Sequence, residues 1–140
     1  MKFLCLCYYD TVAFSLLDAT EIEDVGKACR PHDAALKATG KVVAQGSLSA
    51  PEGWSHFISR DGRPQLKPGP YQEGTRLAGA FFLVDAGSVE EAQDVASKHA
   101  AANYGEHIGF AVEVRPCEMF ESYPPPAPRP VAETAGVTVR

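Results

Sequence analysis

The chain has 140 residues, of which 45% are hydrophobic, and this length and composition suit one domain with a sizeable core. Its formal net charge of -5 argues against partners such as nucleic acid or an anionic membrane surface, because both select for basic surfaces. No apolar run reaches the roughly 18 residues that a membrane-spanning helix needs.

The four cysteines, at positions 5, 7, 29 and 117, include no C-x-x-C pair and no zinc-type spacing. Cys5 and Cys7 lie two residues apart on one predicted strand, which is a poor geometry for a disulfide. The opening residues, MKFLCLCYYD, lack a small-residue cleavage pattern and are interpreted as a strand and not as a signal peptide. We therefore expect buried, reduced thiols and a cytoplasmic protein.

A strand is predicted over residues 2–8, with apolar side chains on both faces, which is typical of a central strand covered on both sides. Thr20 and Glu23 have the spacing of a capping box, which predicts that a helix begins there. Pro31 predicts a kink in this helix or a division into two short helices, and Gly40 is expected to end it.

Three further strands are predicted in the middle of the chain, over residues 41–48, 54–60 and 78–85. Asp61-Gly62 is a strong hairpin signal, so a short strand over 65–67 should pair with 54–60. The stiff segment Pro68-Gly69-Pro70-Tyr71 then leads into the strand over 78–85.

A second capping box, Ser88 to Glu91, predicts a helix that ends near Tyr104-Gly105, and the last strand is expected over 110–115. The order β-α-β-β-(β)-β-α-β predicts an α+β fold, a ferredoxin-like sandwich. Because the strands are apolar on both faces and helices cover only one, we expect a homodimer packed sheet to sheet.

The composition changes at Ser122, so we divide the chain into a domain over 1–121 and a proline-rich tail over 122–140. The tail holds five of the eleven prolines, and Pro124–Pro130 should form polyproline II. Either it is loose or it lies across the partner subunit.

Several motifs, in their order along the chain, resemble the YCII-related proteins, and within them the DGPF-domain branch. The similarity covers roughly residues 1–118, and its order is more specific than any single piece. The motifs are MKFLCLCYYD, Ala38-Thr39-Gly40, Gln45-Gly46-Ser47-Leu48, Arg60-Asp61-Gly62, Pro68-Gly69-Pro70-Tyr71-Gln72-Glu73, Leu77 to Val84, Ser88 to Ala92, and Val112 to Pro116.

The resemblance implies a dimeric α+β barrel. It also implies functions of two kinds, because some relatives accompany extracytoplasmic-function sigma factors and one relative removes chloride from a chlorinated hydroxyquinol. In that group a histidine in the first helical region pairs with an aspartate in a proposed acid–base dyad, and His32 resembles this histidine. This chain has Ala38 and Thr39 where the aspartate would fall, and Pro68 replaces the aspartate of the signature loop.

The residues suggest candidates for a site, and His32 is the candidate acid or base because imidazole titrates near neutral pH. His56 shares a strand face with Trp54 and Ile58 and is either a ligand contact or a satisfied core residue. His99, on the apolar stripe of the second long helix, is expected to be structural, and His107 to be solvated.

The remaining candidates are binding residues. Tyr8 and Tyr71 offer phenol hydroxyls, and the stiff loop would hold Tyr71 at low entropic cost. Gly69 suits a positive φ or a close approach, and Arg60 is a candidate for binding an anionic group or part of a solvated turn. No metal or cofactor is expected, and Glu113 and Arg115 are expected to form a surface ion pair.

Two functional hypotheses of different class follow. The first is a cofactor-free lyase or isomerase that uses His32 on a small organic substrate. The second is a non-catalytic module that binds a small ligand or a protein such as a sigma factor.

Overall fold

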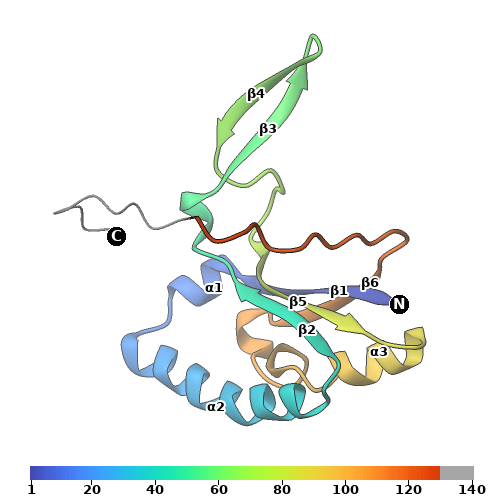
Figure 1. Ribbon diagram of the computed structural model, residues 1–140. Helices are drawn as coiled ribbons and strands as arrows, with labels where there is room; N and C mark the ends of the chain where they lie inside the picture. Colours follow the sequence, from blue (N-terminus) through green and yellow to red (C-terminus); the bar gives the residue numbers. More distant parts are fainter. Residues whose placement is uncertain (130–140) are drawn as a thin grey trace, which may run out of the picture.

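The computed structural model describes residues 1–129, and its element order matches the predicted one, with one additional short α-helix and three 3₁₀ helices (Figure 1). The elements are β1 (Lys2–Asp10), α1 (Thr11–Ser15), α2 (Ala19–Ala38), β2 (Val42–Ser47), β3 (Ser55–Arg60), β4 (Arg63–Pro68), β5 (Arg76–Asp85), α3 (Val89–Ala96) and β6 (Ala111–Pro116). Within residues 1–129, no helix has the length and apolar character needed to cross a membrane.

Four strands form an antiparallel sheet in the order β2-β5-β1-β6. Both long helices, α2 and α3, lie on one face of this sheet (Figure 1). The predicted α+β, ferredoxin-like architecture is therefore confirmed.

The core lies between the sheet and the helices. Phe3, Cys5 and Cys7 of β1 are buried there with Phe82 of β5 and Leu36 of α2. Burying a side chain such as Phe82 stabilises the fold by roughly 1.5–3 kcal/mol. The alternate residues of the central strands, on the open face of the sheet, are only half-buried, as in Leu4, Leu6, Phe81 and Leu83.

The first long helix begins two residues before the predicted start. Asp18, and not Thr20, is the N-cap: its carboxylate accepts from the Glu21 amide at 2.8 Å, and the Glu21 carboxylate accepts from the Asp18 amide at 3.1 Å. The predicted kink or division at Pro31 was wrong, because α2 continues through Pro31 to Ala38. Gly40 follows the helix with φ +69°, as its predicted role at the helix end requires.

The second long helix is shorter than predicted, ending at Ala96 and not near Gly105. Side chains replace the helical hydrogen bonds beyond that point. The His99 imidazole accepts from the Ala101 amide at 3.0 Å, and the Asn103 amide group donates to the carbonyls of Ser97 and His99. These contacts turn the chain into the 3₁₀ helix η2 (Ala100–Ala102).

Strands β3 and β4 form a separate hairpin that stands away from the sheet on its open side (Figure 1). The predicted Asp61-Gly62 turn is confirmed: the two residues have φ 53° and 73°, the conformation of a type I′ turn. At the hairpin base, Gly69 has φ +82° and its amide donates to the Trp54 carbonyl at 2.7 Å.

After β6 the chain continues without helix or strand from residue 117 to 129, on the same side of the sheet as the hairpin (Figure 1). Lys2 lies over the Phe120 ring, 5.3 Å from its centre. The expected proline-rich tail begins within this segment, and its part beyond residue 129, including Pro130, lies outside the described residues.

Candidate functional site

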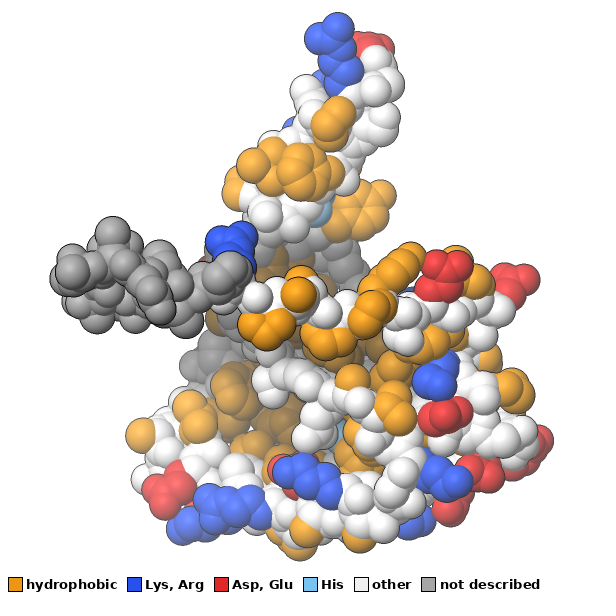
Figure 2. All heavy atoms as spheres, in the orientation of Figure 1, with side chains coloured by type: hydrophobic (Ala, Val, Ile, Leu, Met, Phe, Trp, Pro, Cys, Tyr) orange, Lys and Arg blue, Asp and Glu red, His pale blue; other side chains and the backbone are white. Residues whose placement is uncertain are grey.

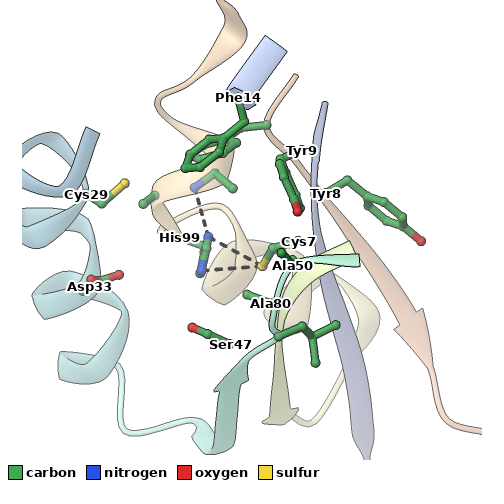
Figure 3. A pocket seen from close by; sticks show the side chains of 15 residues that line it. Cys7, Tyr8, Tyr9, Phe14, Cys29, Asp33, Ser47, Ala50, Ala80 and His99 are labelled. Atoms are coloured by element: carbon green, nitrogen blue, oxygen red, sulfur yellow. Dashed lines mark hydrogen bonds between the residues drawn. The ribbon is translucent and has the colours of Figure 1, made fainter. Parts of the chain in front are cut away.

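A cavity of about 480 Å³ lies between the helix-covered face of the sheet and α2 (Figure 3). This volume is within the range typical of small-molecule sites. Its walls are largely apolar and include the rings of Tyr9, Phe14 and Phe110. The few polar side chains in it come from different elements, chiefly Asp33 of α2 and His99, which precedes η2.

His99 is held on several sides. Its ring stacks on Phe82, with 5.0 Å between ring centres and 6° between planes. Its Nδ1 accepts from the Ala101 amide, so the neutral ring carries its proton on Nε2. The Cys7 Sγ lies 3.6 Å from Nε2, a weak contact that a ligand oxygen could replace. The neutral imidazole therefore offers an N–H donor to the cavity.

Burial lowers the pKa of His99, the carboxylate of Asp33 opposes that shift, and the positive charge of His32 adds to it. Asp33 itself is exposed and lies on the α2 side of the cavity, across from His99 (Figure 3). Burial is the main cause that raises the pKa of the Cys29 thiol, and the Asp33 carboxylate adds to that rise. The cavity thus combines a neutral imidazole with a carboxylate at its edge, and their charges interact.

All four cysteines are free thiols; Cys5 and Cys7 are buried as expected, whereas Cys29 and Cys117 are only half-buried. Cys7 and Cys29 line the cavity. Burial raises the pKa of Cys7 to about 12, with a smaller contribution from Cys5. A thiol with so high a pKa is protonated at neutral pH and is a poor nucleophile. Cys7 is therefore part of the wall that positions His99.

The wall also depends on a bulge in the sheet. The pairing of β1 with β5 shifts between Cys7 and Tyr8, so that Gly79 is passed over. A Cβ atom on Gly79 would lie 2.8 Å from the Tyr9 ring. Glycine at this position therefore lets the Tyr9 ring lie flat against β5 and line the cavity.

Two of the residues predicted from the sequence lie close to this cavity. His32 is half-buried on α2 beside Asp33 and does not line the cavity. Tyr8 contributes to the lining, but its ring points away in Figure 3. Its hydroxyl donates to Glu113 at 3.2 Å, next to the predicted Glu113–Arg115 ion pair, which is present.

The other four predicted residues lie on the hairpin and its base. The His56 ring nitrogen Nδ1 is 2.8 Å from the Gly69 carbonyl, and the His56 and Tyr71 rings meet edge to face at 5.5 Å. Tyr71 is 74% exposed, and Arg60 is exposed at the hairpin tip. The structure brings His56, Gly69 and Tyr71 together as a support for the hairpin, and none of the four lines the cavity.

Sequence reasoning missed His99 and Asp33 as neighbours. From the sequence, His99 is expected to be structural on a helical stripe, and Asp33 is not among the candidate residues. A usable signal was the run of alanines after His99, since small residues leave room beside a sheet. Among residues 1–129, no three His, Cys, Asp or Glu side chains are grouped so that they could hold a metal ion.

Comparison with known proteins gives one family. A model described as the YCII-related domain matches residues 1–118, which is most of the chain. None of the curated proteins compared with the chain matches it.

Proposed function

The chain belongs to the YCII-related family, and from that premise we propose that it is a cofactor-free proton-transfer enzyme, of lyase or isomerase type, acting on a small organic substrate. One observation carries this proposal: a neutral imidazole and a carboxylate, from separate elements, border one apolar cavity. In such a pair, the carboxylate can accept a proton from the substrate while the imidazole donates a hydrogen bond to the oxygen on which charge develops.

The roles follow from the hydrogen bonding. Because Nδ1 of His99 is occupied by the Ala101 amide, the ring acts through Nε2–H, donating to a substrate oxygen on which negative charge develops. Asp33 is the group that can accept a proton from substrate carbon or oxygen. The substrate class that fits is a small, mainly apolar molecule with a carbonyl or enol oxygen, held against the rings of Tyr9 and Phe14, which pack edge to face in the cavity wall.

His32, the candidate from the sequence, remains part of the proposal. It lies beside Asp33, and its charge acts on His99, so it can tune the pair without contacting the substrate. The domain over 1–121, with the tail from 122 onward, is the unit to which we assign the activity. The free thiols support a cytoplasmic location.

The test begins with a thermal-shift screen of small carbonyl and phenolic compounds, since ligands that bind only the folded state raise its stability. Each hit is then incubated in D2O, and deuterium incorporation into the ligand is measured by NMR. We expect Asp33→Asn to slow exchange by about 100-fold or more while the thermal shift is retained. His32→Ala should change the rate far less.

Unchanged exchange in Asp33→Asn would contradict the assigned base. Glu23→Gln, a carboxylate change on an exposed part of the same helix, is the matched control and should exchange at the wild-type rate.

A second candidate function is a non-catalytic module that binds a small ligand, for example an accessory to an extracytoplasmic-function sigma factor. The exposure of Asp33 favours it, because a solvated carboxylate is a weaker base than a buried one. Ligands that bind wild type and Asp33→Asn equally, with no exchange and no product, would support this candidate instead.

Proteins of this family are typically dimeric, and we propose that this chain forms a homodimer with the open faces of the two sheets together. The half-buried row of Leu4, Leu6, Phe81 and Leu83 supports this arrangement, since no helix covers it. A sheet apolar on both faces needs a second layer there.

A further inference from the structure

The β3–β4 hairpin carries an apolar patch that its own subunit leaves mostly exposed. Phe57 and Leu66 are direct cross-strand partners, and they are 66% and 64% exposed. Figure 2 shows apolar side chains gathered on the projecting hairpin, with basic side chains at its tip. A two-stranded hairpin alone is marginally stable in water, so such a patch indicates a partner.

We propose that this hairpin is an arm that clasps a second copy of the same chain, laying the Phe57–Leu66 pair against the partner's surface. The inference rests on the proposed sheet-to-sheet dimer and adds a second, separate contact to it. Because a two-fold dimer is self-complementary, each subunit would give one arm and receive one.

The reach of the arm fits this role. Each of its strands has six residues, which at about 3.3 Å per residue extends about 20 Å. The four-stranded sheet is about 14 Å across at the usual 4.8 Å between strands. The arm also stands on the open side of the sheet, the side from which a second copy would approach (Figure 1).

Charge favours a second copy as the occupant. The hairpin carries Arg60, Arg63 and Lys67 against one acid, Asp61, in a chain whose formal net charge is -5. On the same side of the sheet, Glu118 and Glu121 are exposed in the segment after β6 (Figure 1). A basic arm on an acidic body is complementary to another copy of itself, and such charges steer association.

The proline loop gives the arm a fixed base. The Gly69 amide donates to the Trp54 carbonyl, and His56 hydrogen-bonds to the Gly69 carbonyl. Trp54 in turn donates its indole N–H to the Ser49 carbonyl at 2.9 Å. A preorganised arm loses little entropy when it docks.

The test is sedimentation equilibrium of the full chain with the double substitution Phe57→Ser and Leu66→Ser. We expect the dimer dissociation constant to rise at least tenfold relative to wild type. The control is Gln65→Ser, an exposed change on the opposite face of the same strand, which should dimerise as wild type does. Far-UV circular dichroism checks that each variant is folded.

A second variant leaves the packing of the arm untouched. Arg60→Glu with Arg63→Glu should weaken the dimer several-fold and reduce its dependence on salt. Isotope-filtered NMR on mixed labelled and unlabelled chains should show contacts from the Phe57 ring to the other copy.

The outcomes distinguish the proposed arm contact from the proposed sheet-to-sheet dimer. A wild-type dimer that both arm variants leave unchanged overturns the arm and leaves the sheet-to-sheet dimer standing. A chain that is monomeric up to high concentration overturns both. Weakening by the arm variants, with none in Gln65→Ser, supports the arm.

Discussion

At the scale of single residues, the backbone decides which chemistry His99 can perform. The Ala101 amide occupies Nδ1, and stacking on Phe82 fixes the ring plane, so Nε2 alone remains for a ligand. Burial holds the ring neutral, which is the form that donates without already carrying charge. The same imidazole on the protein surface would titrate near pH 6.5 and would lack this orientation.

We predict that the neighbouring charges shift the His99 pKa in opposite directions. Asp33→Asn should lower it further, because the stabilising carboxylate is lost, and His32→Ala should raise it, because a like charge is lost. The measurement is an NMR titration of the His99 ring signals. Shifts of the same sign in both variants would contradict the placement of these groups around the cavity.

The same shift makes stability depend on pH. The His99 pKa is lower in the folded than in the unfolded state, so the unfolded chain binds the proton more tightly. This contribution is complete above about pH 6.5, the unfolded value, and is lost as the pH falls through the folded pKa. The free energy of unfolding of His99→Gln should therefore fall less steeply below pH 6.5 than that of wild type.

At the scale of elements, helix boundaries depend on which of several local bonds forms. The segment DATEIE contains two overlapping capping boxes, Asp18 to Glu21 and Thr20 to Glu23, and the prediction used the second. The structure uses Asp18, which starts α2 at Ala19. Likewise, the hydrophobic spacing predicted that the second long helix continues to about residue 105. The helix instead ends at Ala96, because the side chains of His99 and Asn103 hydrogen-bond to the backbone beyond it.

A pair of substitutions tests the start of α2. Asp18→Ala should lower the free energy of unfolding by about 1 kcal/mol, because the Glu21 amide loses its acceptor. Thr20→Ala, inside the first helical turn, should change it by less than about 0.5 kcal/mol. Urea unfolding of both variants checks this, and the reverse order of effects would restore Thr20 as the cap.

The sequence therefore predicted the features that depend on residues close together in the chain. The order of the elements along the chain, the Asp61-Gly62 turn and the two apolar faces of β1 came directly from alternation and turn chemistry. The cavity could not be found this way, because Cys7, Asp33 and His99 come together only when β1, α2 and η2 pack. Their sequence separations carry no signal of that proximity.

At the scale of the whole molecule, the two faces of the sheet are covered unequally. Helices bury one face, while the hairpin and the segment after β6 extend on the other side without burying its leucines (Figure 1). The half-buried apolar side chains of the open face therefore lie on the same side of the sheet as the basic hairpin and the acidic side chains of the segment after β6. This asymmetry is the basis of the proposed homodimer.

We predict that Leu6→Lys, a change in the middle of that layer, yields a monomer. The new ammonium group would be buried between two sheets in the dimer, whereas in the monomer it lies beside Glu113, its cross-strand partner. Light scattering after gel filtration gives the mass. Gln93→Lys, on the exposed side of α3, adds the same charge away from the sheet and should leave the mass unchanged.

The segment of residues 48–54 joins the cavity to the arm, and it contains a tryptophan whose fluorescence can report on both. Leu48 and Ala50 line the cavity, Ser49 between them binds the indole of Trp54, and the arm begins at the next residue. Trp54 is the single tryptophan of the chain. Its emission therefore comes from one place, so ligand entry on one side and subunit pairing on the other can both be followed without attaching a dye.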